Sequence, residues 1–102
     1  MNKILDGYWK VYIGETHILT KKIEGESGKN FLPWGSELFL ADFKIKDMEL
    51  HYKYWPVRDV LEKINEHALK GTMYVRNEKW FDFTMHYAGE INDKQRSKES
   101  AL

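Results

Sequence analysis

Apolar and polar residues alternate along most of the chain, between short segments rich in turn-forming residues. Because successive side chains of a strand point to opposite faces, this alternation is typical of half-buried β-strands. Trp9, Val11 and Ile13 form a first apolar face, and the turn signal Gly14-Glu15-Thr16 leads into a second alternating run over 17–23. These two runs predict a β-hairpin.

Two further hairpins follow from the same periodicity, with turns near Lys46-Asp47 and at Asn77-Glu78-Lys79. Between the hairpins, residues 25–30 have the composition of a loop, and 31–36 continue irregularly because they contain a proline. The four apolar faces are Phe39, Ala41, Phe43 and Ile45; Met48, Leu50, Tyr52 and Tyr54; Leu69, Gly71, Met73 and Val75; and Phe81, Phe83, Met85 and Tyr87.

One segment, residues 57–66, fits two kinds of element. Leu61, Glu62 and Lys63 are strong helix formers and Pro56 precedes the run, which favours a short helix. Hairpins on both sides and a turn signal at Asn65-Glu66 favour a strand. Both alternatives stay open, and strand is preferred.

These elements predict an all-β protein, an antiparallel meander that forms a small barrel or half-barrel. About seven short strands are expected to curl so that their edges pair. The 102 residues suffice for one domain, predicted over 1–88. Residues 89–102 contain few apolar side chains and are predicted to be a flexible polar tail.

Charge and composition narrow the classes of function. Sixteen Lys and Arg balance sixteen Asp and Glu, so the net charge gives no reason to expect nucleic acid or membrane as a partner. The chain contains no cysteine, which excludes disulfides and thiolate chemistry. The first residues become charged by Asp6 without a signal-like apolar run, so a cytoplasmic protein is expected.

The triplet Gly7-Tyr8-Trp9 lies at the start of the predicted meander. It resembles the opening signature of lipocalin-like (calycin) barrels. The resemblance implies that Trp9 packs across the closed end of a barrel, that Gly7 lets the chain turn into it, and that the barrel forms an apolar cup for a small hydrophobic molecule.

Several side chains are candidates to bind such a molecule, because their predicted positions face the interior and they are large, apolar or polarizable. The same side chains could instead fill the core completely. Tyr52 and Tyr54 are the best polar handles for a ligand carboxylate or hydroxyl. The candidate ligand-binding residues are Trp9, Trp34, Phe43, Tyr52, Tyr54, Met73, Phe83 and Met85.

The irregular segment Phe31–Trp34 has three possible roles: a lid over the barrel mouth, an anchor for a partner, or a small apolar cluster that only stabilises the fold. Exposed tryptophans are common interface anchors. Trp34 and Trp55 therefore support a second hypothesis, a protein–protein interaction module that binds a protein partner or forms a homodimer.

No motif for catalysis or metal binding is present, and no catalytic residue, metal site or cofactor is predicted. The four histidines are widely separated, and alternation places His51 and His86 on the solvent face. A barrel enzyme that uses Tyr52, Tyr54, Arg58 and Glu49 for acid–base chemistry is the least favoured hypothesis. The favoured function is that of a small binding protein for a hydrophobic or aromatic ligand.

Overall fold

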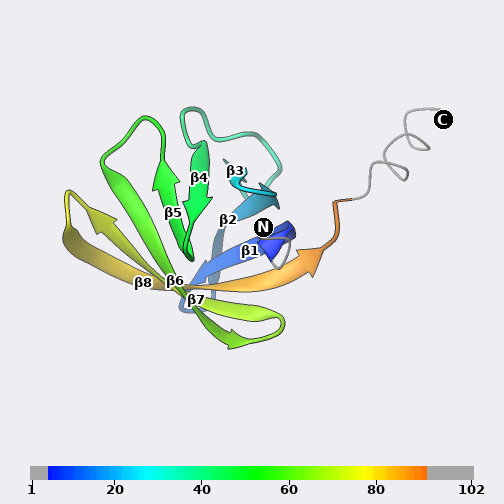
Figure 1. The fold of residues 1–102 in the computed structure, drawn as a ribbon. Coiled ribbons are helices and arrows are strands. Elements are labelled where there is room, and N and C mark those ends of the chain that lie inside the picture. Colours follow the sequence, from blue (N-terminus) through cyan, green and yellow to red (C-terminus); the bar gives the residue numbers. More distant parts are fainter. Residues whose placement is uncertain (1–4, 92–102) are drawn as a thin grey trace.

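Eight antiparallel strands follow one another around a closed barrel in the computed structural model, which describes residues 5–91 (Figure 1). Each strand pairs with the next, and β1 pairs with β8 to close the wall. The predicted all-β antiparallel meander is confirmed, and the barrel closes completely. The strands are β1 (Gly7–Ile13), β2 (Thr16–Glu24), β3 (Ser27–Phe31), β4 (Phe43–Lys46), β5 (Glu49–Tyr52), β6 (Val57–Asn65), β7 (Ala68–Val75) and β8 (Glu78–Gly89).

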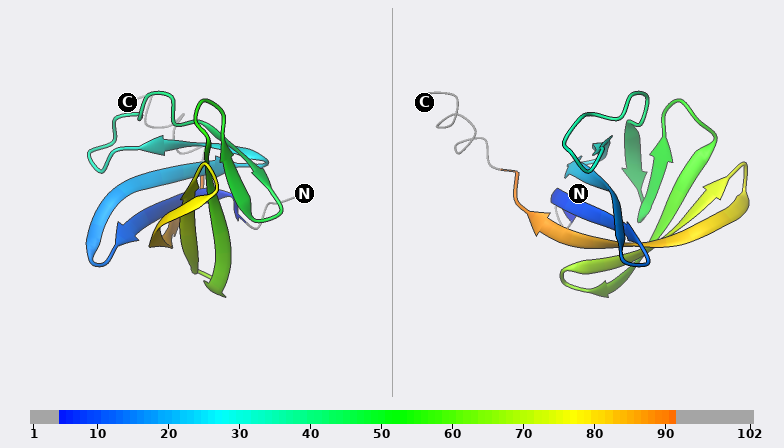
Figure 2. Two further views of the ribbon diagram at one scale, coloured as in Figure 1. Left: turned by 90° about the vertical axis from the view of Figure 1, so that its left-hand side faces the viewer. Right: turned by 180° about the vertical axis from the view of Figure 1, so that it is seen from behind.

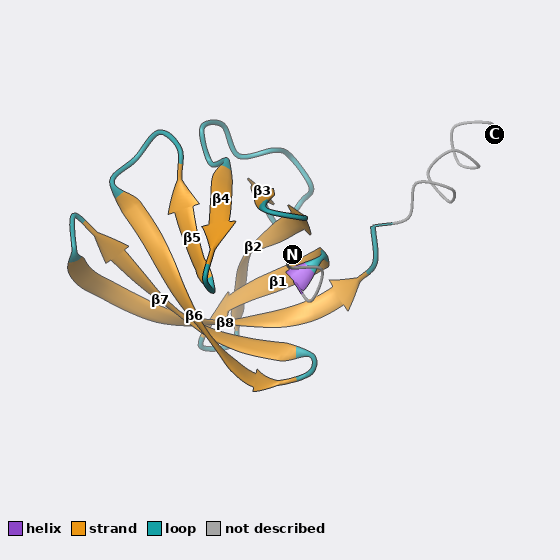
Figure 3. Cartoon of the chain, in the orientation of Figure 1, coloured by secondary structure: helices purple, strands orange, loops and turns teal. Residues whose placement is uncertain are grey.

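Two-residue turns keep several neighbouring strands in register (Figure 3). Asp47 and Met48, between β4 and β5, have φ values of 52° and 63°. Arg76 and Asn77, between β7 and β8, have values of 52° and 69°. Positive φ at both central residues gives a hairpin turn whose twist matches that of the strands. The predicted hairpins at these two places are confirmed.

Residues 57–66, for which both a helix and a strand are compatible with the sequence, lie mostly in strand β6. β6 pairs with β5 on one side and with β7 on the other. These two ladders satisfy its backbone groups and outweigh the local helix propensity of Leu61, Glu62 and Lys63. The helical alternative is wrong.

Strand β3 lies where a loop is expected from the composition of residues 25–30, so that prediction is wrong. The strand consists mainly of polar residues and glycine, and Asn30 is its one fully buried residue. Gly28 is required by packing: a Cβ there would lie 2.5 Å from the Phe43 ring and 2.6 Å from the carbonyl oxygen of Lys22. A glycine in a strand marks such a close approach.

β4 and β5 are shorter than their apolar patterns indicate. β4 begins only at Phe43, and β5 ends at Tyr52, so Phe39, Ala41 and Tyr54 lie in loops. These loops, 32–42 and 53–56, lie together at one end of the barrel, as both views of Figure 2 show. The indole N–H of Trp55 donates to the carbonyl oxygen of Leu40 at 2.8 Å, which joins the two loops.

Core side chains pack toward the other end of the barrel. The indole N–H of Trp9 donates to the carbonyl oxygen of Leu5 at 2.9 Å, and its ring meets Tyr87 edge-on with 5.4 Å between centroids. Gly7 (φ 130°) lies so close to Tyr87 that a Cβ would come within 2.6 Å of that ring. The buried core consists of Leu5, Trp9, Val11, Ile23, Phe43, Ile45, Leu50, Leu61, Leu69, Phe83 and Met85.

β8 continues to Gly89, one residue beyond the domain boundary expected from the sequence. Residues 92–102 of the expected tail lie outside the described residues. No helix within residues 5–91 combines the length and hydropathy that a membrane span needs.

Candidate functional site

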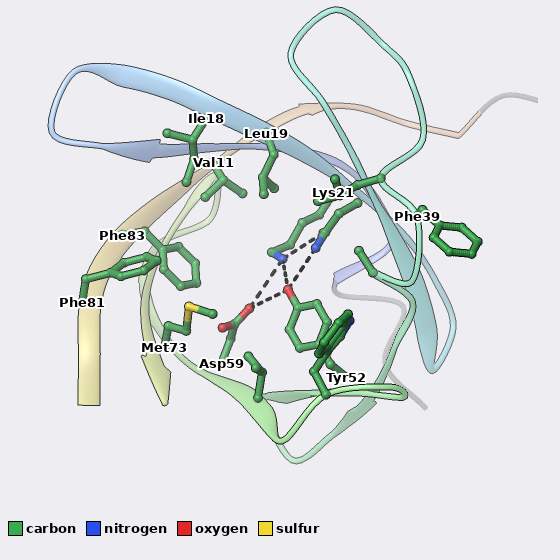
Figure 4. A pocket seen from close by; sticks show the side chains of 15 residues that line it. Val11, Ile18, Leu19, Lys21, Phe39, Tyr52, Asp59, Met73, Phe81 and Phe83 are labelled. Carbon is green, nitrogen blue, oxygen red and sulfur yellow. Dashed lines mark hydrogen bonds and ion pairs between the residues drawn. The ribbon is translucent and has the colours of Figure 1, made fainter. Parts of the chain in front are cut away.

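The barrel encloses a cavity of about 430 Å³ on the side of the core away from Trp9 (Figure 4). Ligand pockets of small molecules commonly have volumes of about 300–1,000 Å³. Seven strands and both mouth loops contribute to the wall, most of which is apolar. The lining residues are Val11, Ile18, Leu19, Lys21, Asn30, Leu38, Phe39, Ala41, Tyr52, Trp55, Val57, Asp59, Met73, Phe81 and Phe83.

Part of the apolar wall depends on an irregularity in β2. Val11 pairs with Leu19 but Tyr12 pairs with His17, so Ile18 is an extra residue between the two pairs. A bulge of this kind re-aims side chains on the bulged strand. Ile18 and Leu19 consequently both line the cavity, as Figure 4 shows.

Four polar side chains interrupt the apolar wall and contact one another inside the barrel. We call Lys21, Asn30, Tyr52 and Asp59 the polar cluster. The ammonium nitrogen of Lys21 donates to Asn30 Oδ1 at 2.9 Å and to the Tyr52 hydroxyl at 2.6 Å. Asn30 Nδ2 donates to the same hydroxyl at 3.0 Å, and this hydroxyl donates to Asp59 Oδ2 at 3.0 Å.

An ion pair completes the polar cluster. Lys21 Nζ lies 3.5 Å from Asp59 Oδ2, and the exposed fractions of the two side chains are 2% and 4%. Lys21 Nζ also lies 5.0 Å above the centroid of the Phe43 ring, within the range of a cation–π contact. The core ring of Phe43 thus adds to the stabilisation of the cation by its carboxylate partner.

The surroundings of the polar cluster hold its groups in defined protonation states. Burial is the largest influence on Lys21 and opposes its charge, but Tyr52 and Asp59 together outweigh burial and raise the pKa of Lys21. Burial raises the pKa of Tyr52, against the opposing effect of Lys21. At neutral pH the cavity wall therefore carries an ammonium group and a neutral phenol.

The structure places three of the predicted ligand-binding residues, Tyr52, Met73 and Phe83, on the cavity wall. Trp9, Phe43 and Met85 are buried in the core, and none of them lines this cavity. Trp9 instead lies toward the other end of the barrel, near Leu5 and Leu69. Phe83 belongs both to the core and to the cavity wall, whereas Trp9, Phe43 and Met85 serve core packing alone.

Two predicted site residues lie at the surface. Tyr54 has an exposed fraction of 56%, because β5 ends at Tyr52 and the chain then leaves the wall. Its predicted inward position is wrong. Trp34 has an exposed fraction of 74% and does not line the cavity. Leu38 and Phe39, further along the same loop, form the rim instead of the segment Phe31–Trp34.

The four residues of the acid–base hypothesis are not brought together. Tyr52 faces the interior, whereas Arg58 stacks over the ring of Tyr74 at 4.5 Å and lies 3.7 Å from Glu49 on the outer face. Tyr54 is in the mouth loop. His51 and His86 are exposed, as alternation predicts.

Lys21, Asn30 and Asp59 are the polar site residues that sequence reasoning missed. Lys21 lies two residues after Leu19 and two before Ile23, and Asp59 has the same spacing to its apolar neighbours within 57–61. A charged residue at the inward position of an alternating strand is a signal for a buried polar site. Asn30 gives no such signal, because β3 lacks apolar alternation.

No protein-family model, curated protein or solved structure matches the chain. The chemistry of the site therefore rests on the geometry of its own residues.

Proposed function

We propose that this protein binds a small, largely apolar molecule in the barrel cavity. The observation that carries the proposal is the cavity of about 430 Å³, apolar over most of its wall and marked at one place by the polar cluster. Binding sites for small molecules typically combine apolar walls with a few placed polar groups. The polar groups fix the orientation of a ligand whose apolar part supplies most of the affinity.

The distribution of side chains within the barrel supports a site rather than a packing defect. Eight-stranded barrels have interiors that side chains either fill or leave open for one ligand. Here Trp9, Phe43 and Leu50 are almost completely buried, while the space beside the polar cluster stays open. A void of this size forfeits contacts that larger side chains could make, and it lowers stability.

The resemblance to lipocalin-like barrels points to the same function. The resemblance rests on the triplet Gly7-Tyr8-Trp9, which opens strand β1 of this barrel. It implies an apolar cup for a small hydrophobic molecule.

Native mass spectrometry of the protein purified gently from its expression host tests the proposal, followed by denaturing release of any bound molecule. We expect a folded chain that carries a ligand-sized extra mass. Leu19→Trp would place a large ring in the cavity and should abolish the extra mass. Lys10→Trp, an exposed position on β1, is the matched control and should retain it. An equal extra mass on both variants, beyond the masses of their chains, would contradict the proposal.

A second candidate function, binding of another protein, is favoured by the exposed aromatic side chains. Trp34 and Phe39 in the loop 32–42 have exposed fractions of 74% and 84%, and Trp80 in β8 one of 61%. Aromatic side chains are typical anchors of protein interfaces. Tyr54 and Trp55 in the loop 53–56 are also exposed.

The simplest partner to test is a second copy of the chain. If this function holds, sedimentation will give a dimer for the wild-type protein and a monomer for the double variant Trp34→Ser, Phe39→Ser. Acrylamide should then quench tryptophan fluorescence less in the dimer. A wild-type monomer whose tryptophans are as accessible as those of the double variant would remove support for this self-association.

A further inference from the structure

The polar cluster uses almost all of its own hydrogen-bond donors. The ammonium group of Lys21 has three partners: Asn30 Oδ1, the Tyr52 hydroxyl and Asp59 Oδ2. The Tyr52 hydroxyl accepts from Lys21 and Asn30 and donates to Asp59, which exhausts its capacity. The remaining donor is the second N–H of Asn30. The cluster therefore offers little to a ligand that only accepts hydrogen bonds.

The second carboxylate oxygen of Asp59 is in the opposite situation. Both cluster contacts of Asp59 go to Oδ2, and within residues 5–91 no donor makes a hydrogen bond to Oδ1. Figure 4 shows this oxygen turned away from Tyr52, toward the side of the cavity that carries Met73. Within the described residues, every fully buried side-chain oxygen has a hydrogen-bond partner. Oδ1 has no partner, so it is not fully buried, and because Asp59 lines the cavity, Oδ1 is reached from there. A donor for it must come from the cavity contents.

Charge decides which donor fits best. A carboxylate ligand would lose its hydration while facing the charged Asp59, and it would find no free ammonium hydrogen on Lys21. A cationic ligand at Oδ1 would approach a carboxylate whose charge Lys21 already compensates at 3.5 Å. An uncharged donor avoids both penalties, and its hydrogen bond to a carboxylate is charge-assisted.

We propose that the ligand's polar group is an uncharged hydrogen-bond donor, a hydroxyl or N–H on an apolar body, which donates to Asp59 Oδ1. This inference rests on the proposed function and makes it more specific. Phe81 and Phe83 on the wall and Trp55 at the rim suit a ligand body that is itself aromatic.

Four naphthalene probes with the substituent at the same ring carbon test the inference by isothermal titration calorimetry at neutral pH. Naphthol carries a neutral donor, methoxynaphthalene only an acceptor, naphthoate an anion and naphthylmethylammonium a cation. A hydrogen bond to a charged group is worth about 1.5–3 kcal/mol. We therefore expect naphthol to bind about tenfold or more tightly than methoxynaphthalene, and more tightly than either ion.

Tightest binding by naphthoate or by naphthylmethylammonium would overturn the inference, as would equal binding of naphthol and methoxynaphthalene. In each of these cases the proposed function would survive, because a probe would still bind. No binding by any of the four probes would count against the cavity as a binding site, and both proposals would fall together.

A variant with both charges removed assigns the preference to its residue. Lys21→Met combined with Asp59→Leu leaves neither charge without its partner, so it should fold. We expect it to bind methoxynaphthalene and to lose the preference for naphthol. Asp82→Asn, on the outer face where Asp82 accepts from Thr72, is the control and should keep that preference. A preference retained in the double variant would contradict the role of Asp59.

Discussion

The ammonium nitrogen of Lys21 lies 2.6 Å from the phenol oxygen of Tyr52, a residue 31 positions further along the chain. β2 and β5, which carry these residues, are separated in the wall by β3 and β4. The hydrogen bond therefore crosses the interior of the barrel. Together with Asn30 on β3 and Asp59 on β6, it links four strands at the cavity.

Tyr52→Phe should destabilise the fold by about 1–3 kcal/mol, because its hydroxyl is the common partner of Lys21, Asn30 and Asp59. The ring and its packing against Phe43 stay in place, so the loss reports the hydroxyl alone. Urea unfolding followed by tryptophan fluorescence measures the change. An unfolding free energy equal to that of the wild type would show that the cluster does not depend on this hydroxyl.

Lys21→Met should cost about 3–5 kcal/mol of unfolding free energy, because it leaves the buried carboxylate of Asp59 without its cation. Adding Asp59→Leu should recover much of that loss, since two apolar side chains leave no unpaired charge. The double-mutant cycle measures the coupling between the two sites by urea unfolding. Additive losses would argue against a buried pair.

Core and cavity residues should respond differently to truncation. Leu50 is fully buried among packed neighbours, so Leu50→Ala should cost about 2–5 kcal/mol. Met73 borders space that is already open, so Met73→Ala removes fewer contacts and should cost clearly less. Thermal and urea unfolding of both variants provide the comparison. A Met73→Ala loss as large as that of Leu50→Ala would indicate that the cavity is filled by side chains in solution.

Gly71→Ala should weaken ligand binding, and its cost in unfolding free energy should be smaller than that of Gly28→Ala. A Cβ at Gly71 would meet the far end of the Phe83 ring at 2.2 Å, and that ring lines the cavity into which it can turn. At Gly28 a Cβ would also meet the carbonyl oxygen of Lys22 at 2.6 Å, and backbone cannot turn aside in this way. Gly28→Ala should therefore be the more destabilising variant. The opposite order in urea unfolding would contradict this packing.

The stability of the protein should fall at alkaline pH. The pKa of Lys21 is raised above its ordinary value of 10.5 by Tyr52 and Asp59, which outweigh the opposing effect of burial, and burial raises that of Tyr52 above 10.0. The folded state thus keeps both protons to higher pH than the unfolded chain does. Their contribution is complete below the unfolded pKa values and is lost as pH rises through the folded ones.

Urea midpoints from neutral to strongly alkaline pH measure this loss. The variant Lys21→Met, Asp59→Leu, which lacks the ammonium group, should lose less stability over the same range. An identical alkaline profile for the two proteins would assign the effect to other groups.

The fold could be predicted from the sequence because the core is built from period-two alternation. Phe81, Phe83 and Met85 on β8 all face inward, as their spacing predicts. β3 could not be predicted in this way, since it carries polar residues and a glycine that fits against Phe43. Local propensity likewise could not decide residues 57–66, because the ladders to β5 and β7 depend on distant partners.

The site was less predictable than the fold. Tyr52 could be identified as a polar handle, but its partners lie on three other strands, and register alone brings them together. Lys21 is followed by Lys22, and a pair of lysines is typical of a protein surface. Only the position of Lys21 between two inward apolar residues marks it as buried. Whether Tyr54 faces in or out depends on where β5 ends, and β5 ends where its pairing with β4 and β6 stops.

Binding of naphthol followed by methyl NMR tests the central claim most directly. The methyl groups of Val11, Ile18, Leu19 and Met73 line the cavity, whereas those of Ile45 and Leu50 lie in the core away from it. We predict saturable shifts concentrated on the first set, with little change in the second. Shifts that do not saturate, or that fall mainly on Ile45 and Leu50, would contradict a binding site in the barrel.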